Sequence, residues 1–100
     1  MDSQLKRGII DYVVLAALKH EDSYGYKIVQ DISKIMEISE STLYPVLRRL
    51  KKQGFLTTRN VMHQSRVRKY YSLTEKGRMR LKEAADDFRI FRDIYEYIVR

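Results

Sequence analysis

Basic residues are concentrated in the middle of the sequence, and binding a polyanion is the chemistry that they favour. Residues 39–82 contain twelve Lys and Arg against two acidic residues, a net charge of +10. Residues 1–38 sum to −1 and residues 83–100 to −2, so this segment holds the whole excess behind the net charge of +7. Segregated positive charge is typical of nucleic-acid-binding proteins, whereas a merely solvated basic face is the plainer interpretation.

The first candidate contacts lie on a predicted helix that begins with hydroxyl side chains. Short hydroxyls and backbone N–H groups at a helix N-terminus bind phosphate well, because the helix dipole adds to the hydrogen bonds. Cations further along can face a DNA groove or its flanking backbone. The candidates are Ser41, Thr42, Tyr44, Arg48 and Lys51, with Arg49 and Lys52 as an alternative cationic pair. Alternatively, Ser41 only caps the helix and Tyr44 packs against the following hairpin.

A second basic group lies in a predicted β-hairpin, where Arg66, Arg68 and Lys69 stand close together. Cations on a hairpin are suited to the phosphates or the minor groove of a duplex. They also keep an exposed sheet edge soluble, which is the alternative interpretation. Together with the basic helix, these residues make double-stranded DNA the expected partner.

The sequence offers little for enzyme or metal chemistry. There is no cysteine, which excludes a disulfide, a thiolate metal site and a cysteine nucleophile. His20 and His63 stand alone, and no cluster of His, Asp and Glu has ligand spacing. No phosphate-binding loop, nucleophile elbow or paired-histidine motif occurs. We therefore expect no catalytic site, no metal and no cofactor, and a protein that is not an enzyme.

Two predicted helices precede the basic helix. Apolar residues at helical spacing indicate the first over residues 5–20. Ser23 is the expected N-cap of the second, whose apolar stripe repeats every four residues from Tyr24 to Ile32. Gly25 within this helix predicts a close approach by another backbone.

The basic helix is expected to begin at a cap on Ser41 and to end at Gly54. A start at Ser41 places Pro45 in the first turn, where its missing N–H removes at most the first helical hydrogen bond. Gly54 is the residue type favoured in the left-handed position just beyond a helix. Apolar residues at i, i+3, i+4 and i+7 form the inward stripe: Leu43, Val46, Leu47 and Leu50.

Two strand-like runs, residues 55–62 and 67–73, predict a β-hairpin with a four-residue connection. Alternation along the second strand puts Tyr70 and Tyr71 on opposite faces, and the sequence leaves open which of them is buried. Thr74 then caps a helix of about 25 residues that runs to the C-terminus.

The predicted order of helix, helix, basic helix, hairpin and helix is that of a winged helix-turn-helix, a mainly α fold with one small β-hairpin. In this fold the third helix enters the major groove and the hairpin lies on the flanking backbone. Glycine and proline are too scarce for a linker. We therefore expect one continuous domain, with DNA binding in residues 1–74 and dimerisation through a helix in residues 75–100.

The last predicted helix carries apolar residues at alternating spacings of three and four, which is typical of helix packing between two chains. These seam residues are Leu81, Ala84, Phe88, Phe91, Tyr95 and Ile98. The alternative interpretation, strongest for Leu81 and Ala84, is packing on the first helix of the same chain. The pattern predicts a homodimer.

Four aromatic residues are candidates for an effector pocket at that interface. Tyr12, Phe88, Phe91 and Tyr95 have the apolar surface to line a cleft for a small aromatic effector. The ordinary interpretation of aromatics at helical spacing is interface core, and the sequence leaves both open.

The chain resembles the PadR-like transcriptional regulators, and among them the short members without a large C-terminal domain. The matching stretches are residues 5–10, 14–18, 24–28, 41–50 and 68–77. The Thr-Leu-Tyr-Pro run at 42–45, followed by Tyr-x-Leu-Thr-x-x-Gly at 71–77, is specific in combination. The resemblance implies repressor function, dimerisation through the C-terminal helix and control by a small molecule or stress signal.

Our main hypothesis is a repressor that binds a roughly palindromic operator as a twofold dimer. Two alternatives remain: a module that binds DNA or RNA without sequence preference, and a protein-interaction adaptor that uses the long helix. The sequence begins without a signal-peptide pattern, and its longest apolar run, residues 12–18, is too short to span a bilayer. We expect a soluble, cytoplasmic protein that does not enter a membrane.

Overall fold

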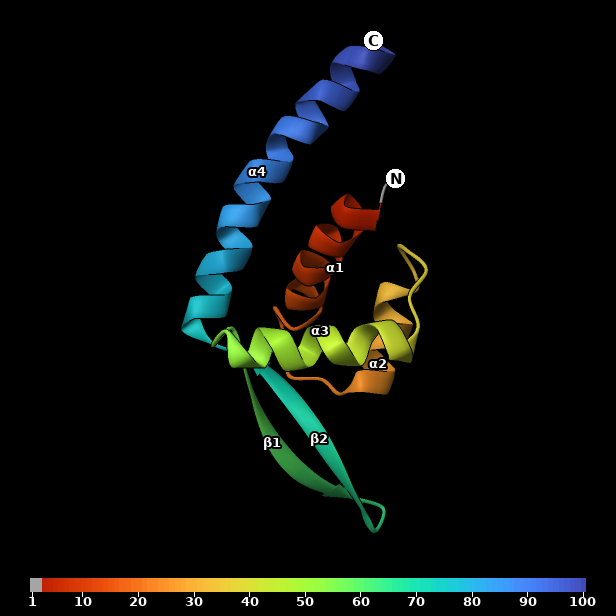
Figure 1. Ribbon diagram of the computed structural model, residues 1–100, viewed down its shortest axis with the longest axis vertical. Helices are drawn as coiled ribbons and strands as arrows, with labels where there is room; N and C mark the ends of the chain where they lie inside the picture. The colour runs from red at the N-terminus through yellow and green to blue at the C-terminus, as the bar shows by residue number, and fades with distance from the viewer. Residues whose placement is uncertain (1–2) are drawn as a thin grey trace.

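A computed structural model describes residues 3–100, with side chains from residue 8 onward. These residues form a winged helix-turn-helix, which confirms the predicted fold class (Figure 1). The elements are, in order, α1 (Ser3–Ala17), α2 (Gly25–Ile32), α3 (Glu40–Lys52), β1 (Leu56–His63), β2 (Arg66–Leu73) and α4 (Glu75–Val99). In Figure 1 the hairpin extends below α3, whereas α4 rises above it.

The core lies where α1, α2, α3 and the base of the hairpin meet. Each helix buries one apolar stripe, because residues three and four apart lie on the same helical face. The hairpin closes the core from below with alternate residues of its two strands. The most deeply buried side chains are Val14, Leu15, Leu18, Ile28, Ile32, Leu43, Leu47, Leu50 and Leu56.

The start of α2 differs from the prediction. The N-cap is Tyr24, and no side chain caps the first turn. Ser23 is buried and forms an isolated β-bridge: its N–H donates to the Tyr71 carbonyl at 3.2 Å and its carbonyl accepts from the Tyr71 N–H at 2.7 Å. The predicted Ser23 cap is wrong, because this residue is held against the edge of β2.

The start of α3 also differs. Ser39 is the N-cap, and its hydroxyl oxygen accepts a hydrogen bond from the Thr42 N–H at 3.3 Å. The predicted cap at Ser41 is therefore two residues late, and Pro45 lies in the second turn. The Ser41 carbonyl loses its helical partner at Pro45. Both residues are exposed, so water can hydrate the carbonyl that the proline leaves free.

The end of α3 follows the prediction. Gly54 has φ 85°, in the left-handed region. Its N–H donates to the Lys51 carbonyl and the Phe55 N–H to the Leu50 carbonyl, both at 3.0 Å. This pair of bonds is the Schellman motif, which satisfies two carbonyls at the end of the helix.

The hairpin is longer than predicted. Its register runs from Leu56 opposite Leu73 to His63 opposite Arg66, so the connection has two residues and not four. Gln64 and Ser65 have φ values of 50° and 65°. Two positive φ values are those of a type I′ turn, whose twist matches that of paired strands. Neither Gln64 nor Ser65 is of a residue type preferred in this turn, which explains why a two-residue turn was not predicted.

Alternation along β2 buries Tyr71 and Leu73, which settles the orientation that the sequence left open. Thr74 caps α4 as predicted, since its hydroxyl oxygen accepts from the Gly77 N–H at 3.0 Å. The long α4 stretches the molecule to 54 × 26 × 22 Å. None of the described helices is long and apolar enough to cross a membrane.

Candidate nucleic-acid interface

The outer face of α3 is the side opposite its buried stripe. Ser41, Arg48 and Lys52 lie along this side at helical spacing, and all three are exposed. Lys51 is also exposed, but lies on the flank of the helix with Tyr44. Lys52, which the sequence placed only in an alternative pair, is therefore as well placed on this face as Arg48.

Arg49 belongs to a different part of the structure. Its two terminal nitrogens donate to the two carboxylate oxygens of Asp11 on α1, at 2.7 and 2.8 Å. This bidentate pair joins α1 to α3, and its side-chain hydrogen bond raises the pKa of Arg49. The guanidinium of Arg49 is thus held away from the outer face of α3.

Some of the predicted contacts converge on one open pocket between α2, α3 and β2. Tyr44 and Arg48 line it from α3, and Arg68 and Lys69 line it from β2, around a volume of about 460 Å³. We call this the α2–α3–wing pocket. Four of the eight predicted contacts therefore meet at one place, although they come from two elements.

The other predicted contacts lie outside the pocket. Ser41 and Thr42 stand near the start of α3, where the Ser39 hydroxyl contacts theirs at 3.0 and 3.2 Å. Arg66 is at the far end of the hairpin, beside His63 in a second concavity. These positions extend the candidate interface along α3 and along the wing.

Gly25 lets Tyr44 approach the start of α2. A Cβ atom on Gly25 would lie 2.8 Å from Cζ of Tyr44, closer than such atoms come in proteins. The predicted close approach is therefore present, but the neighbour is an aromatic ring and not a backbone. The Tyr44 hydroxyl therefore lies at the N-terminus of α2.

A row of aromatic and cationic side chains in contact holds the wing beside the start of α2. The Arg68 guanidinium lies 4.0 Å from the centre of the Tyr24 ring, and Tyr24 lies 5.3 Å from Tyr70. Arg59 lies 5.2 Å from the centre of the Tyr70 ring and pairs with Asp22 at 3.0 Å. Sequence analysis missed this row. The signal was the cross-strand pairing of Arg59 with Tyr70, which requires the register to be known.

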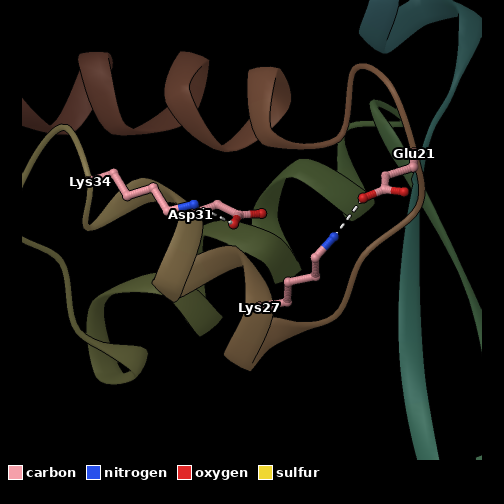
Figure 2. A network of polar contacts seen from close by, with 4 residues as sticks. All are labelled: Glu21, Lys27, Asp31 and Lys34. Carbon is pink, nitrogen blue, oxygen red and sulfur yellow. Dashed lines mark hydrogen bonds and ion pairs between the residues drawn. The ribbon is translucent and has the colours of Figure 1, made fainter.

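Hydrogen bonds from Ser72 and then from Arg59 lower the pKa of Asp22. Around α2, Lys27 pairs with Glu21 from the preceding loop at 2.5 Å, and Asp31 pairs with Lys34 from the following turn at 3.8 Å (Figure 2). These carboxylates neutralise cations away from the outer face of α3.

The cations of the candidate interface have no such partners. Among the described residues, none of them has a carboxylate oxygen within 4.0 Å of its charged nitrogens. They are Arg48, Lys51, Lys52, Arg66, Arg68 and Lys69. A field of one sign along a helix and its neighbouring hairpin attracts a polyanion. The described residues contain no group of three or more potential metal ligands.

A family model, the transcriptional regulator PadR-like family, matches residues 14–83. The chain belongs to the PadR-like family of transcriptional regulators. The matched region includes the helix-turn-helix and both strands of the wing. Members of this family are transcription regulators and not enzymes, so the chain is a regulator.

Three solved structures place this PadR-like chain among relatives. A Streptococcus mutans UA159 protein has a TM-score of 0.86 at 42% identity, over 93% of this chain and 88% of that one. A PadR-like transcription factor of Bacteroides fragilis has a TM-score of 0.82 at 32% identity, over 96% of this chain and 95% of that one. Bacillus subtilis PadR, solved in complex with operator DNA, has a TM-score of 0.71 at 26% identity, over 77% of this chain and 46% of that one.

The same Bacillus subtilis protein, named as a negative transcriptional regulator, is 26% identical over 80 residues. That alignment covers 75% of this chain and 44% of the relative. This PadR-like chain thus spans less than half of that regulator.

The α4 helix of this PadR-like regulator exposes much of its apolar surface. Ala84 is buried and Leu81 packs against the core, so the first two seam residues contact their own chain. Further along, Phe91, Tyr95 and Ile98 are 58%, 62% and 72% exposed. The alternative interpretation therefore holds for the start of the seam, whereas its last three residues expose most of their surface.

Three of the four predicted effector residues touch one another. The Tyr12 and Phe88 rings meet edge to face with centres 5.7 Å apart, and Phe88 lies 5.8 Å from Phe91. The Arg80 guanidinium lies 4.9 Å from the centre of the Tyr12 ring and donates to its hydroxyl. Tyr95 has no aromatic contact with this cluster within the described residues.

Proposed function

We propose that this regulator is a sequence-specific DNA-binding repressor that acts as a homodimer on a roughly palindromic operator. The observation that carries the proposal is the set of cations on α3 and the wing that lack carboxylate partners. Three of these cations, Arg48, Arg68 and Lys69, line one pocket together with Tyr44. The relative solved with operator DNA and named as a negative regulator supports the same direction of control. Each α3 enters a major groove, and the protein excludes polymerase from the promoter.

Fluorescence anisotropy on duplexes that tile the regulator's own upstream region, at two salt concentrations, tests this proposal. We expect one tile to bind at least ~10³-fold more tightly than unrelated duplex. Equal binding to all tiles that collapses with salt would leave only backbone contacts, and the repressor proposal would be replaced. Single-stranded RNA as competitor separates the remaining alternative, a module that binds nucleic acid without sequence preference.

A pair of arginine variants makes the test specific to the interface. Arg48→Ala removes a cation from the outer face of α3, whereas Arg89→Ala removes one from α4, where its partner is Asp86. Both change the net charge equally. We expect Arg48→Ala to weaken operator binding and to reduce the salt slope by about one, and Arg89→Ala to change neither.

We propose further that α4 is the dimerisation element, through the part of the seam beyond Ala84, which its own chain leaves largely exposed. The exposed fractions of Phe91, Tyr95 and Ile98 support this, because large apolar side chains in a row on one helix favour burial against a partner. A dimer places two recognition helices about one turn of DNA apart, as a palindromic operator requires. In this scheme residues 1–74 bind DNA and residues 75–100 join the two chains in the cytoplasm.

The aromatic cluster of Tyr12, Phe88 and Phe91 is our proposed effector site, with Tyr95 completing it in the dimer. The edge-to-face contacts and the Arg80 guanidinium supply apolar walls and one polar group, which suits a small aromatic molecule. A panel of aromatic compounds, screened for release of the operator, is the test. If no compound changes the affinity, the cluster is plain interface core.

A further inference from the structure

We propose that the α2–α3–wing pocket binds one phosphate of the DNA backbone, through the main-chain N–H groups at the start of α2 and the hydroxyl of Tyr71. This inference rests on the proposed function, and it adds donors that none of the predicted contacts included. It makes the start of α2 a DNA contact in addition to α3 and the wing.

The start of α2 is open to a ligand. No side chain caps its first turn, and the first helical hydrogen bond runs from the Ile28 N–H to the Tyr24 carbonyl at 2.9 Å. The N–H groups of Gly25, Tyr26 and Lys27 precede that bond and have no acceptor among the described residues. Gly25 and Tyr26 line the pocket. Uncapped N–H groups at the positive end of a helix dipole are suited to an anion.

Tyr71 provides the second and independent observation. Its side chain is only 6% exposed, yet it lines the pocket. Its hydroxyl makes no hydrogen bond to the described residues, and its oxygen is not enclosed, so it can donate to a ligand in the pocket. Burial raises the pKa of Tyr71, and the effect of nearby Tyr44 adds to that rise while Arg48 opposes it. The phenol therefore stays protonated and can donate to an anion.

The rim of the pocket has the charge that a phosphate needs. Arg48 approaches from α3 and Lys69 from β2, on two sides of the same volume. Arg68 is held at the rim by stacking on Tyr24, at 4.0 Å from the ring centre. No acidic residue lines the pocket. The donors and charges thus come from α2, α3 and the wing at once.

The position of the pocket favours a phosphate that belongs to DNA. Tyr44 and Arg48 line the pocket and also belong to the exposed side of α3, the helix that we place in the major groove. A duplex on that helix brings its flanking backbone over the pocket, and backbone phosphates fix the register of a DNA-binding protein. A free phosphate or phosphorylated metabolite has the same chemistry, so the experiment must separate the two sources.

Backbone amide NMR with inorganic phosphate tests the pocket without DNA, against chloride at equal ionic strength. We expect the amide signals of Gly25 and Tyr26 to shift in the wild type. Tyr71→Phe keeps the buried ring and removes only the hydroxyl, and we expect it to weaken phosphate binding roughly tenfold. Tyr70→Phe removes a hydroxyl from the opposite face of β2 and should leave binding unchanged. Absence of the shifts, or equal binding by Tyr71→Phe, overturns the site.

Duplexes with a single neutral methylphosphonate at successive positions identify the source of the phosphate. One position should weaken wild-type binding strongly, and at that position Tyr71→Phe should cause no additional loss. If Tyr71→Phe weakens binding equally on every duplex, or if a duplex fails to displace phosphate from the amides, the DNA backbone is not the ligand. Failure of the proposed function is distinct: no tile of the upstream region would bind selectively, while Gly25 and Tyr26 would still respond to phosphate.

Discussion

Arg48 and Arg49 are neighbours in α3, yet the surroundings of their side chains differ. Arg49 forms a bidentate pair with Asp11, a residue with a quarter of its side chain exposed, and so links α3 to α1. Arg48 is exposed beside the α2–α3–wing pocket, with no carboxylate near it among the described residues. Residue type alone does not separate these roles. The direction of each side chain around the helix separates them, because successive residues of a helix point in directions about 100° apart.

The first prediction separates stability from DNA binding at these two residues. Asp11→Ala leaves the guanidinium of Arg49 without its partner and should lower the free energy of unfolding by about 1 kcal/mol, a modest value because the pair is partly exposed. Arg48→Ala should change stability by less than about 0.5 kcal/mol. Urea unfolding measures both. Anisotropy should show the reverse order, with weaker operator binding for Arg48→Ala. Equal stability of the two variants would contradict a structural role for Arg49.

The second prediction concerns Gly25 and the Tyr44 ring. In Gly25→Ala the new methyl group displaces the ring, which can swing outward because Tyr44 is 37% exposed. We therefore expect a folded protein whose DNA binding is weaker by about tenfold, the effect of one lost hydrogen bond to a charged group. Gly8→Ala is the matched control, since nothing lies within 4 Å of a Cβ there. It should bind DNA normally and gain up to about 1 kcal/mol of stability from helix propensity. Normal DNA binding by Gly25→Ala would show that the ring position does not matter.

The elements differ in how far local sequence determines them. Apolar spacing predicted the four helices, because each helix needs one buried face, and two runs rich in β-branched and apolar residues predicted the hairpin. The ends were predicted where one residue type decides them, as at Gly54 and Thr74. They were wrong where two physical effects compete. At the start of α3, the cap by Ser39 outweighs the helical bond lost at Pro45, whereas the sequence argument favoured Ser41 because that start keeps Pro45 in the first turn.

The candidate site was less predictable than the elements. Arg48 and Arg68 were named from charge alone, but the pocket that joins them exists only after α3 packs beside β2. The contact between Tyr24 and Tyr70 was not predicted, because it depends on the register of the hairpin. That register depends in turn on a two-residue turn without glycine. Tyr71 was ambiguous, since alternation gives two faces without saying which one meets the core.

The third prediction tests the start of α3. Ser39→Ala removes the hydroxyl oxygen that accepts from Thr42 and should lower the free energy of unfolding by about 1 kcal/mol. Ser41→Ala, two residues later in the first turn, is the control and should cost less than about 0.5 kcal/mol. Thermal or urea unfolding of both variants decides between the two caps. A larger loss for Ser41→Ala would restore the cap expected from the sequence.

At the scale of the whole molecule, α4 lies largely outside the domain. Its first turns are anchored, since Ala84 is buried and Phe88 meets Tyr12 of α1. The second half extends beyond α1 in Figure 1. It exposes a succession of large apolar side chains. An isolated helical segment of this kind is marginal in water, because most helix stability in proteins comes from packing an apolar face. In the proposed dimer, a second chain provides that packing.

The last prediction identifies the side of α4 that meets the second chain. Phe91 lies on the seam and Ile90 lies off it, although they are adjacent and similarly exposed at 58% and 62%. Phe91→Asp would place an unpaired charge in the interface, and burying such a charge is costly. We expect it to raise the dimer dissociation constant at least tenfold, or about 1.4 kcal/mol, while the folded chain survives because the residue is exposed in one protomer.

Light scattering after size exclusion, over a range of concentrations, measures this shift. Ile90→Asp introduces the same charge one residue away and should remain a dimer with normal operator binding. Phe91→Asp should lose both the dimer and the tight operator complex, because a monomer contacts only one half-site. If Ile90→Asp dissociates and Phe91→Asp does not, the partner lies on the other side of α4. If both variants and the wild type are monomers, the twofold operator model fails and binding must be explained by one chain.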